Sequence, residues 1–252
     1  MMRLNIRIFS LILIGLLISA CATPPRYRAH PQLDTRIEKI KTITVIPLKM
    51  DVYQVTAGGV KEKMDEWCMQ AKRNVLTAIE DELKLRPLLN IKSFSETFMS
   101  EDKKINLEQT GALFEAVNSS IIIHTYGQPV NRFPEKIQNF DYTLGPEVRQ
   151  LSDQTDGLLL VRGVDNISTG GRKALQAGSV VLGALVGVQV TPMLGVTAVN
   201  LALVDANTGE VLWFNFHASA GDHDLRDPIN TTAMIMDILK DFPIKKPAQL
   251  HD

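Results

Sequence analysis

The chain carries two cysteines, and one of them, Cys68, has the chemistry of a nucleophile if a base such as His124 lies beside it. Cys68 follows Trp67 on the apolar edge of an amphipathic segment, where an inert and buried thiol is the commoner finding. The sequence contains no G-x-S-x-G, H-E-x-x-H, Walker or G-x-G-x-x-G motif. We therefore predict no catalytic residue and no enzymatic activity.

Three adjacent side chains, Asp222, His223 and Asp224, are of the types that bind metal ions. Neighbouring residues on one loop rarely converge on a single ion, and Asp227 close by is a natural helix cap. The 27 basic residues nearly balance the 28 acidic residues, so the basic face that nucleic acid requires is missing. We predict no metal, no cofactor and no nucleic-acid partner.

The first twenty residues have the layout of a secretory signal peptide. Two arginines precede an apolar run from Phe9 to Ile18, and the small residues Ser19 and Ala20 stand directly before Cys21. A cysteine at such a cleavage site resembles the lipobox of bacterial lipoproteins. The resemblance implies that residues 1–20 are removed and that Cys21 is acylated, which would anchor the protein in a membrane through lipid.

The segment after Cys21 is expected to connect this lipid to the folded part. Residues 22–36 contain three prolines and several polar residues, which predicts a flexible tether over residues 21–38 and a single domain over residues 39–245. By resemblance to enterobacterial sorting, Ala22 implies an outer-membrane location, with the domain facing the periplasm.

The apolar periodicity predicts alternating strands and helices. In chain order these are a strand over Thr42–Leu48, a helix over Val60–Leu83, a strand over Leu88–Phe94, a helix over Leu107–Val117, a buried strand over Ser120–His124, a short helix over Pro146–Thr155, a strand over Gly157–Val164, two strands over Val196–Val204 and Val211–Ser219, and a helix from Asp227 to before Pro243. The pattern predicts an α/β (α+β) fold: a single mixed β-sheet with helices on its faces, a closing antiparallel hairpin and a C-terminal helix.

The hairpin has the clearest local signal. Its strands flank a short turn in which Gly209 supplies a positive φ. Because side chains alternate along a strand, its buried face is expected to consist of Leu201, Leu203, Val211 and Trp213.

Two strands resemble those of a group of bacterial envelope lipoproteins. Thr42–Pro47 (TITVIP) is similar to the first strand of that group, and the hairpin with its D-x-x-T-G-E turn, Asp205–Glu210, is similar to its last two strands. The group includes the curli secretion-channel lipoprotein, lipoprotein activators of penicillin-binding proteins and the N-terminal domain of the Tol-system propeller protein. These motifs are structural, so the resemblance implies an envelope setting and no catalytic residue.

An apolar stretch over Ala174–Val190 is the first candidate interaction site. It is preceded by Arg172 and Lys173, which either bind an anion at a helix N-terminus or are solvated cations on a glycine hinge. The stretch is about 25 Å long as a helix, slightly short of a bilayer core, so it packs in the core, on a second subunit or against lipid. Its small residues allow close approach and are Gly178, Gly183 and Gly187.

The second candidate is the aperiodic segment over residues 127–145, which carries Phe133, Phe140 and Tyr142. Aromatic side chains on a loop suit partner binding, although they also serve as a lid over a sheet. The sequence favours a lipid-anchored, non-enzymatic protein that binds an envelope protein or itself as an accessory or assembly factor. An oligomeric export component of the outer membrane and a periplasmic enzyme are the alternatives.

Overall fold

A computed structural model describes residues 26–95, 99–170, 195–220 and 223–246. In chain order its elements are β1 (Arg28–Ala29), α2 (Leu33–Ile37), β2 (Thr42–Val55), β3 (Lys61–Lys63), α3 (Asp65–Lys84), β4 (Asn90–Ser93), α4 (Glu101–Ile121), the π-helix η1 (Ile122–Tyr126), the 3-10 helix η2 (Pro129–Asn131), α5 (Pro134–Asn139), the 3-10 helix η3 (Pro146–Leu151), β5 (Gly157–Ser168), β6 (Val196–Asp205), β7 (Val211–Ala220) and α7 (Pro228–Leu239).

The described strands form one mixed sheet of seven strands in the order β1-β7-β6-β5-β2-β3, with β4 beside the start of β2. β2 runs parallel to β4 and β5, whereas β5, β6 and β7 follow one another antiparallel. The predicted fold is therefore confirmed: one mixed sheet with helices on its faces, a closing hairpin and a C-terminal helix.

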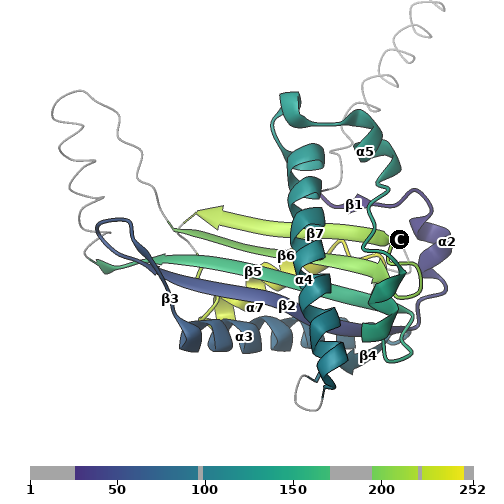
Figure 1. The fold of residues 1–252 in the computed structure, drawn as a ribbon, viewed down its shortest axis with the longest axis horizontal. Helices are drawn as coiled ribbons and strands as arrows, with labels where there is room; N and C mark the ends of the chain where they lie inside the picture. The colour runs from purple at the N-terminus through teal and green to yellow at the C-terminus, as the bar shows by residue number, and fades with distance from the viewer. Residues whose placement is uncertain (1–25, 96–98, 171–194, 221–222, 247–252) are drawn as a thin grey trace, which may run out of the picture.

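Both faces of the sheet are covered, which is why its central strands are almost continuously apolar. On one face, β-strand side chains pack against α3 and α7 around Val161, Leu201 and Trp213. On the other face, α4, η3 and the segment after α5 cover Ile46, Leu160 and Phe214. Figure 1 shows α4 crossing the sheet at a steep angle, whereas α3 runs along the strands.

The β6–β7 hairpin forms as predicted, with Gly209 at φ 75° in its turn. All four residues expected on its buried face are fully buried, but they do not share one face. The register shifts after the Leu203–Trp213 pair, so that Val204 lies opposite Val211. This bulge turns Val211 toward the α4 face, while Leu201, Leu203 and Trp213 face α3 and α7.

Two predicted helices have different limits in the structure. The helix expected over Val60–Leu83 begins at Asp65, because residues 61–63 form the edge strand β3 instead. The helix expected over Leu107–Val117 extends from Glu101 to Ile121, with the Ser100 side chain accepting a hydrogen bond from the Lys103 N–H at its start.

The buried strand predicted over Ser120–His124 is wrong. These residues complete α4 and enter η1, and Ile123 is exposed. A short apolar run fits a strand and a buried helix equally well, and here the nineteen helical residues before Ser120 decide the conformation. The Thr125 hydroxyl donates to the Ile121 carbonyl at 2.8 Å within this wider helical turn.

Residues 28–37, which the sequence places within the tether, are part of the fold. β1 pairs with β7 through Arg28 and Phe214, and α2 follows it. From α2, the Arg36 guanidinium pairs with Asp205 at 2.8 Å and with Glu210 at 2.7 Å, both in the hairpin turn. Burial alone would raise the pKa of Asp205, but hydrogen bonds from the Asn207 N–H and from Arg36 outweigh it, and the pKa is lowered.

Candidate binding surfaces

A groove of about 540 Å³ opens between α3 and α4 at one edge of the sheet. Its floor is the middle of β2, Pro47–Met50, and its walls are α3 residues near Met69 and α4 residues near Ala112. β4 covers this edge of β2 up to Val45 and β3 covers it from Tyr53 onward. Between these two points no described strand pairs with the edge, so the groove follows an incomplete part of the sheet.

The walls of the groove combine apolar side chains with Lys72 of α3 and Glu108 of α4. The Met69 side chain is 55% exposed on α3, and Met50 on the floor is buried. Opposite them, Leu107 and Gly111 belong to α4, and a Cβ on Gly111 would meet nothing within 4 Å. The α4 wall is therefore open at Gly111, and flexible methionines face it, a composition that adapts to different partner side chains.

Four charged side chains form a cluster at one end of this groove. Glu115 on α4 accepts from Lys49 at 3.0 Å and from Arg162 at 3.2 Å, and Lys49 also lies 3.6 Å from Asp51. The hydrogen bond from Lys49 is the main reason why the pKa of Glu115 is lowered. Glu115 is thus ionised at neutral pH, and the cluster neutralises itself instead of presenting one sign of charge.

The nucleophile hypothesis fails on geometry. The Cys68 thiol lies on the α3 face, where its sulfur accepts from the Val52 N–H at 3.2 Å. His124 lies in η1, in the continuation of α4 on the opposite face, and its ring stacks on Phe133 with a centroid distance of 4.2 Å. The two side chains are on different sides of the sheet, and Cys68 instead ties α3 to the edge of β2.

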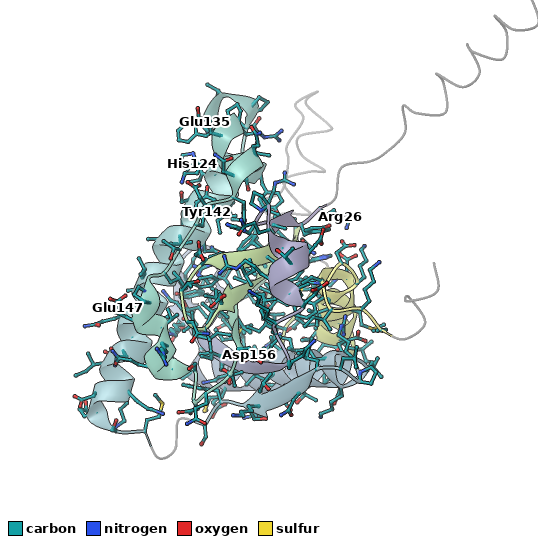
Figure 2. All side chains as sticks on the ribbon, turned by 90° about the vertical axis from the view of Figure 1, so that its right-hand side faces the viewer. Arg26, His124, Glu135, Tyr142, Glu147 and Asp156 are labelled. Atoms are coloured by element: carbon teal, nitrogen blue, oxygen red, sulfur yellow. The ribbon has the colours of Figure 1, made fainter. Side chains whose placement is uncertain are left out.

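The segment from η1 to α5 forms a projection, which we call the tip (residues 122–139). Figure 2 shows Glu135 and His124 at the top of the molecule, well beyond Glu147 and Asp156. The tip carries large apolar side chains that face solvent. Their exposed fractions are 46% for Ile123, 87% for Val130, 51% for Phe133 and 37% for Ile137.

The structure separates the three aromatic residues that the sequence grouped as a binding surface. Phe133 is half exposed on the tip, whereas Phe140 and Tyr142 are buried beneath α4 with their rings edge to face at 5.2 Å. Phe140 adopts a positive φ of 42° at the end of α5, which turns the chain back onto the sheet. Phe140 and Tyr142 act as the lid that the sequence allowed, and they offer no surface to a partner.

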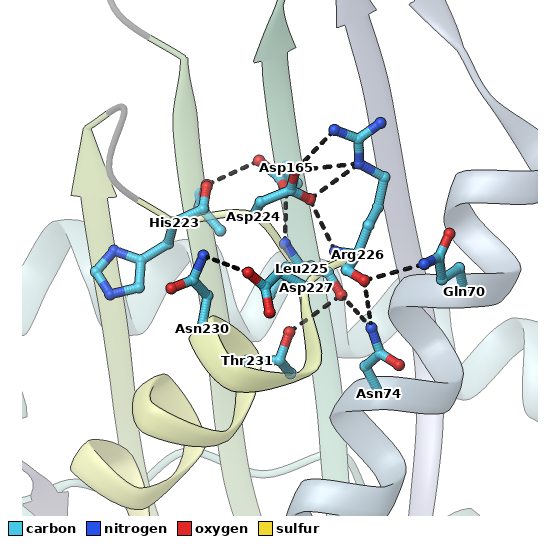
Figure 3. Close-up of polar contacts among 11 residues, drawn as sticks. Gln70, Asn74, Asp165, His223, Asp224, Leu225, Arg226, Asp227, Asn230 and Thr231 are labelled. Carbon is cyan, nitrogen blue, oxygen red and sulfur yellow. Dashed lines mark hydrogen bonds and ion pairs between the residues drawn. The ribbon is translucent and has the colours of Figure 1, made fainter.

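A buried carboxylate, Asp165, lies where β5 meets the segment before α7 (Figure 3). It accepts from the Leu225 N–H at 2.9 Å and from the Thr197 hydroxyl at 2.7 Å. Burial raises the pKa of Asp165, and these two hydrogen bonds only partly offset that effect. Both carboxylate oxygens accept hydrogen bonds within the fold, so Asp165 connects β5 to the segment before α7 and has a structural role.

The neighbouring charged residues also hold the fold together. Asp224 pairs with Arg226 at 2.7 Å, and the Arg226 guanidinium lies 4.0 Å from the centre of the Trp67 ring on α3. Asn74 of α3 donates to the backbone carbonyls of Leu225 and Arg226 (Figure 3). Among the described residues, no three His, Cys, Asp or Glu side chains are placed to hold a metal ion. Asp222 lies outside the described residues.

The remaining predicted sites also lie outside the part of the chain that the structure describes. They are the acylation site Cys21 and the apolar stretch with Arg172, Lys173, Gly178, Gly183 and Gly187. Within the described ranges, no helix combines the length and the apolar character needed to cross a bilayer.

No protein family matches the chain, and no curated protein matches its sequence. Among solved structures, a PelC dodecamer from Paraburkholderia phytofirmans is similar at 12% identity and a TM-score of 0.32, over 85% of this chain and 92% of that chain. A dodecamer of a single-residue variant of that protein matches at 11% identity and a TM-score of 0.31, over 86% and 92% of the two chains. A likeness this weak carries no argument about the activity or assembly of the present chain.

Proposed function

We propose that this chain is a lipid-anchored, non-enzymatic protein of the bacterial cell envelope that binds another protein as an accessory or assembly factor. The observation that carries the proposal is the groove between α3 and α4, with exposed methionine and an open α4 wall along an unpaired part of β2. The two charged clusters described above, around Asp165 and around Glu115, make their hydrogen bonds and ion pairs within the fold. Protein binding at this groove is thus the function that the geometry supports best.

The groove is shaped for inserted side chains and not for an added strand. Pro47 lacks an N–H, and the register of β2 shifts between Pro47 and Lys49. A proline, a bulge and a lysine on an exposed edge are the features that prevent strand addition. We therefore propose that the partner contributes an apolar side chain or a short helix that packs between Met69 and Ala112.

Crosslinking in intact cells tests this mode of binding. A photoreactive amino acid at Met69, 55% exposed in the groove, should capture a defined partner. The same group at Leu85, 52% exposed just beyond the end of α3, should not. Equal capture at both positions, or none at Met69, would refute the groove as the binding site.

A blocking variant gives an independent result. Ala112→Trp fills the groove from the α4 wall, so we expect it to abolish capture of the partner by the photoreactive group at Met69. The melting temperature should stay within a few degrees of the wild type. Unchanged capture by a folded Ala112→Trp protein would contradict the proposal.

The lipid anchor is tested separately at Cys21. If Cys21 is the acylated residue, Cys21→Ser should accumulate as an unprocessed precursor that takes up no labelled palmitate. Normal processing of this variant would refute the lipoprotein assignment and leave the groove hypothesis untouched.

A further inference from the structure

The tip exposes apolar side chains although its backbone is firmly held. The Phe133 N–H donates to the His124 carbonyl at 3.0 Å, and the Arg132 guanidinium donates to the Gly127 carbonyl at 2.7 Å. At Gly127 a Cβ would lie 2.3 Å from the Ile123 carbonyl oxygen, so only glycine allows this turn. Ile123, Val130, Phe133 and Ile137 are thus presented on a fixed scaffold, and their exposure is a property of the folded state.

We propose that this tip inserts into the surface of the bilayer that holds the lipid anchor, giving the protein a second membrane contact. The inference goes beyond protein binding and rests on the acylation of Cys21 in the proposed function. The apolar side chains of the tip would contact lipid. The reason for choosing lipid is that the first described residues, which follow Cys21 closely, are attached to the root of the tip.

The start of the described chain is attached to the root of the tip. The Arg28 guanidinium donates to the Thr125 carbonyl at 3.0 Å and lies 4.3 Å from the centre of the Tyr126 ring. Figure 1 shows β1 directly beneath α5, and Figure 2 places Arg26 on the same upper side as His124. The contacts of Arg28 therefore fix where the chain leaves the fold toward Cys21.

The length of chain between these points keeps the tip close to the anchor. Cys21 precedes Arg28 by seven residues, which span at most about 25 Å when fully extended. Val130 follows Tyr126 by four residues, or at most about 14 Å of chain. An acylated Cys21 thus places the bilayer surface within reach of the tip.

The composition of the tip fits a bilayer interface. Its exposed surface combines apolar side chains with the aromatic ring of Phe133, which suits the boundary between headgroups and acyl chains. Of its basic residues, Arg132 donates to the Gly127 carbonyl and Lys136 pairs with Asp141 at 2.7 Å, while Glu135 adds one negative charge, so the apolar side chains carry the argument. Other exposed apolar residues lie apart from the tip: Leu88 lies between α3 and β4, and Ile229 is at the start of α7. Val130 is also more exposed than either of them.

Tryptophan fluorescence in vesicles tests the proposal with the lipidated mature protein. The protein is reconstituted into phosphatidylethanolamine–phosphatidylglycerol vesicles with or without brominated acyl chains. The added tryptophan of Val130→Trp should lose about half of its emission in brominated vesicles, because an interfacial segment lies about 5–10 Å deep. Ile229→Trp is the matched control, since Ile229 is 80% exposed at the start of α7 and should show no such loss.

Each outcome decides the proposal. Quenching of Val130→Trp alone supports it. A protein that floats with the vesicles but is quenched equally at both positions, or at neither, overturns it. A blue shift at Val130→Trp without quenching means that a second copy covers the tip, and this also overturns it. If the protein does not float at all, the anchor has failed, and the membrane contact fails with it.

Discussion

Trp213 is the side chain whose removal should damage the fold most. It is fully buried on the α3–α7 face, its ring lies edge to face with Phe242 at 5.2 Å, and its indole N–H donates to the Asp241 carbonyl at 3.1 Å. Truncating a buried tryptophan to alanine costs about 3–5 kcal/mol. Within this total, the ring pair contributes about 0.5–1.5 kcal/mol and the hydrogen bond about 0.5–1.5 kcal/mol.

Thermal unfolding followed by circular dichroism measures this cost for Trp213→Ala. For a domain of this size, about 1 kcal/mol corresponds to roughly 2–4 °C, so the melting temperature should fall by roughly 6–20 °C. Trp213→Phe is the matched control: it retains an aromatic ring beside Phe242 but loses the hydrogen bond to Asp241 and some volume, and it should cost about 1–2 kcal/mol. A loss of only a degree or so in Trp213→Ala would refute the packing argument.

Three further changes have defined expectations. Burial raises the pKa of Asp165, so its ionised form opposes folding. The free energy of unfolding of the wild type relative to Asp165→Asn should therefore increase as pH falls through that raised pKa. A difference between the two proteins that is constant with pH would contradict this. The pKa of Glu115 is lowered, so its pairing with Lys49 stabilises the fold above the usual carboxyl range and is lost as pH falls. Because Glu115 is 42% exposed, Glu115→Gln should cost less than about 1 kcal/mol at neutral pH. Gly183→Leu should change oligomer size in mild detergent more than melting temperature; a collapse in stability at unchanged oligomer size would make the apolar stretch ordinary core.

The fold was predictable where the local and the global signals agree. The hairpin has a turn glycine and two strands of matching length, and the structure reproduces both. The face of Val211 was not predictable, because a one-residue bulge after Leu203 reverses the side-chain order and leaves no mark in the apolar pattern. The strand prediction at Ser120–His124 failed for another reason. These five residues fit both the strand period and the helix period, and the preceding helix α4 selects the helix.

The candidate surfaces were likewise only partly predictable from the sequence. The aromatic content of residues 127–145 pointed to a functional segment, but sequence alone could not distinguish the exposed Phe133 from the buried Phe140 and Tyr142, since burial depends on how the chain turns back after α5. The groove was missed entirely. Its floor and walls come from three segments far apart in sequence, and each has the ordinary composition of an amphipathic element. A local sign of it is Met69, an apolar residue on the polar side of the helix between Glu66 and Lys72.

Helix α4 links the two proposed surfaces and sets their separation. The groove residues of α4 run from Leu107 to Glu115 and Ile123 belongs to the tip, so the two surfaces lie eight to sixteen residues apart along a continuous helical path, or roughly 12–24 Å at 1.5 Å per residue. Across the sheet, β1 and β2 are separated by four interstrand spacings, or about 19 Å. With the tip in the bilayer surface, the groove therefore stands clear of the headgroups on the far edge of the sheet. A partner can then occupy the groove without displacing the proposed membrane contact, because helix α4 and its continuation carry both surfaces.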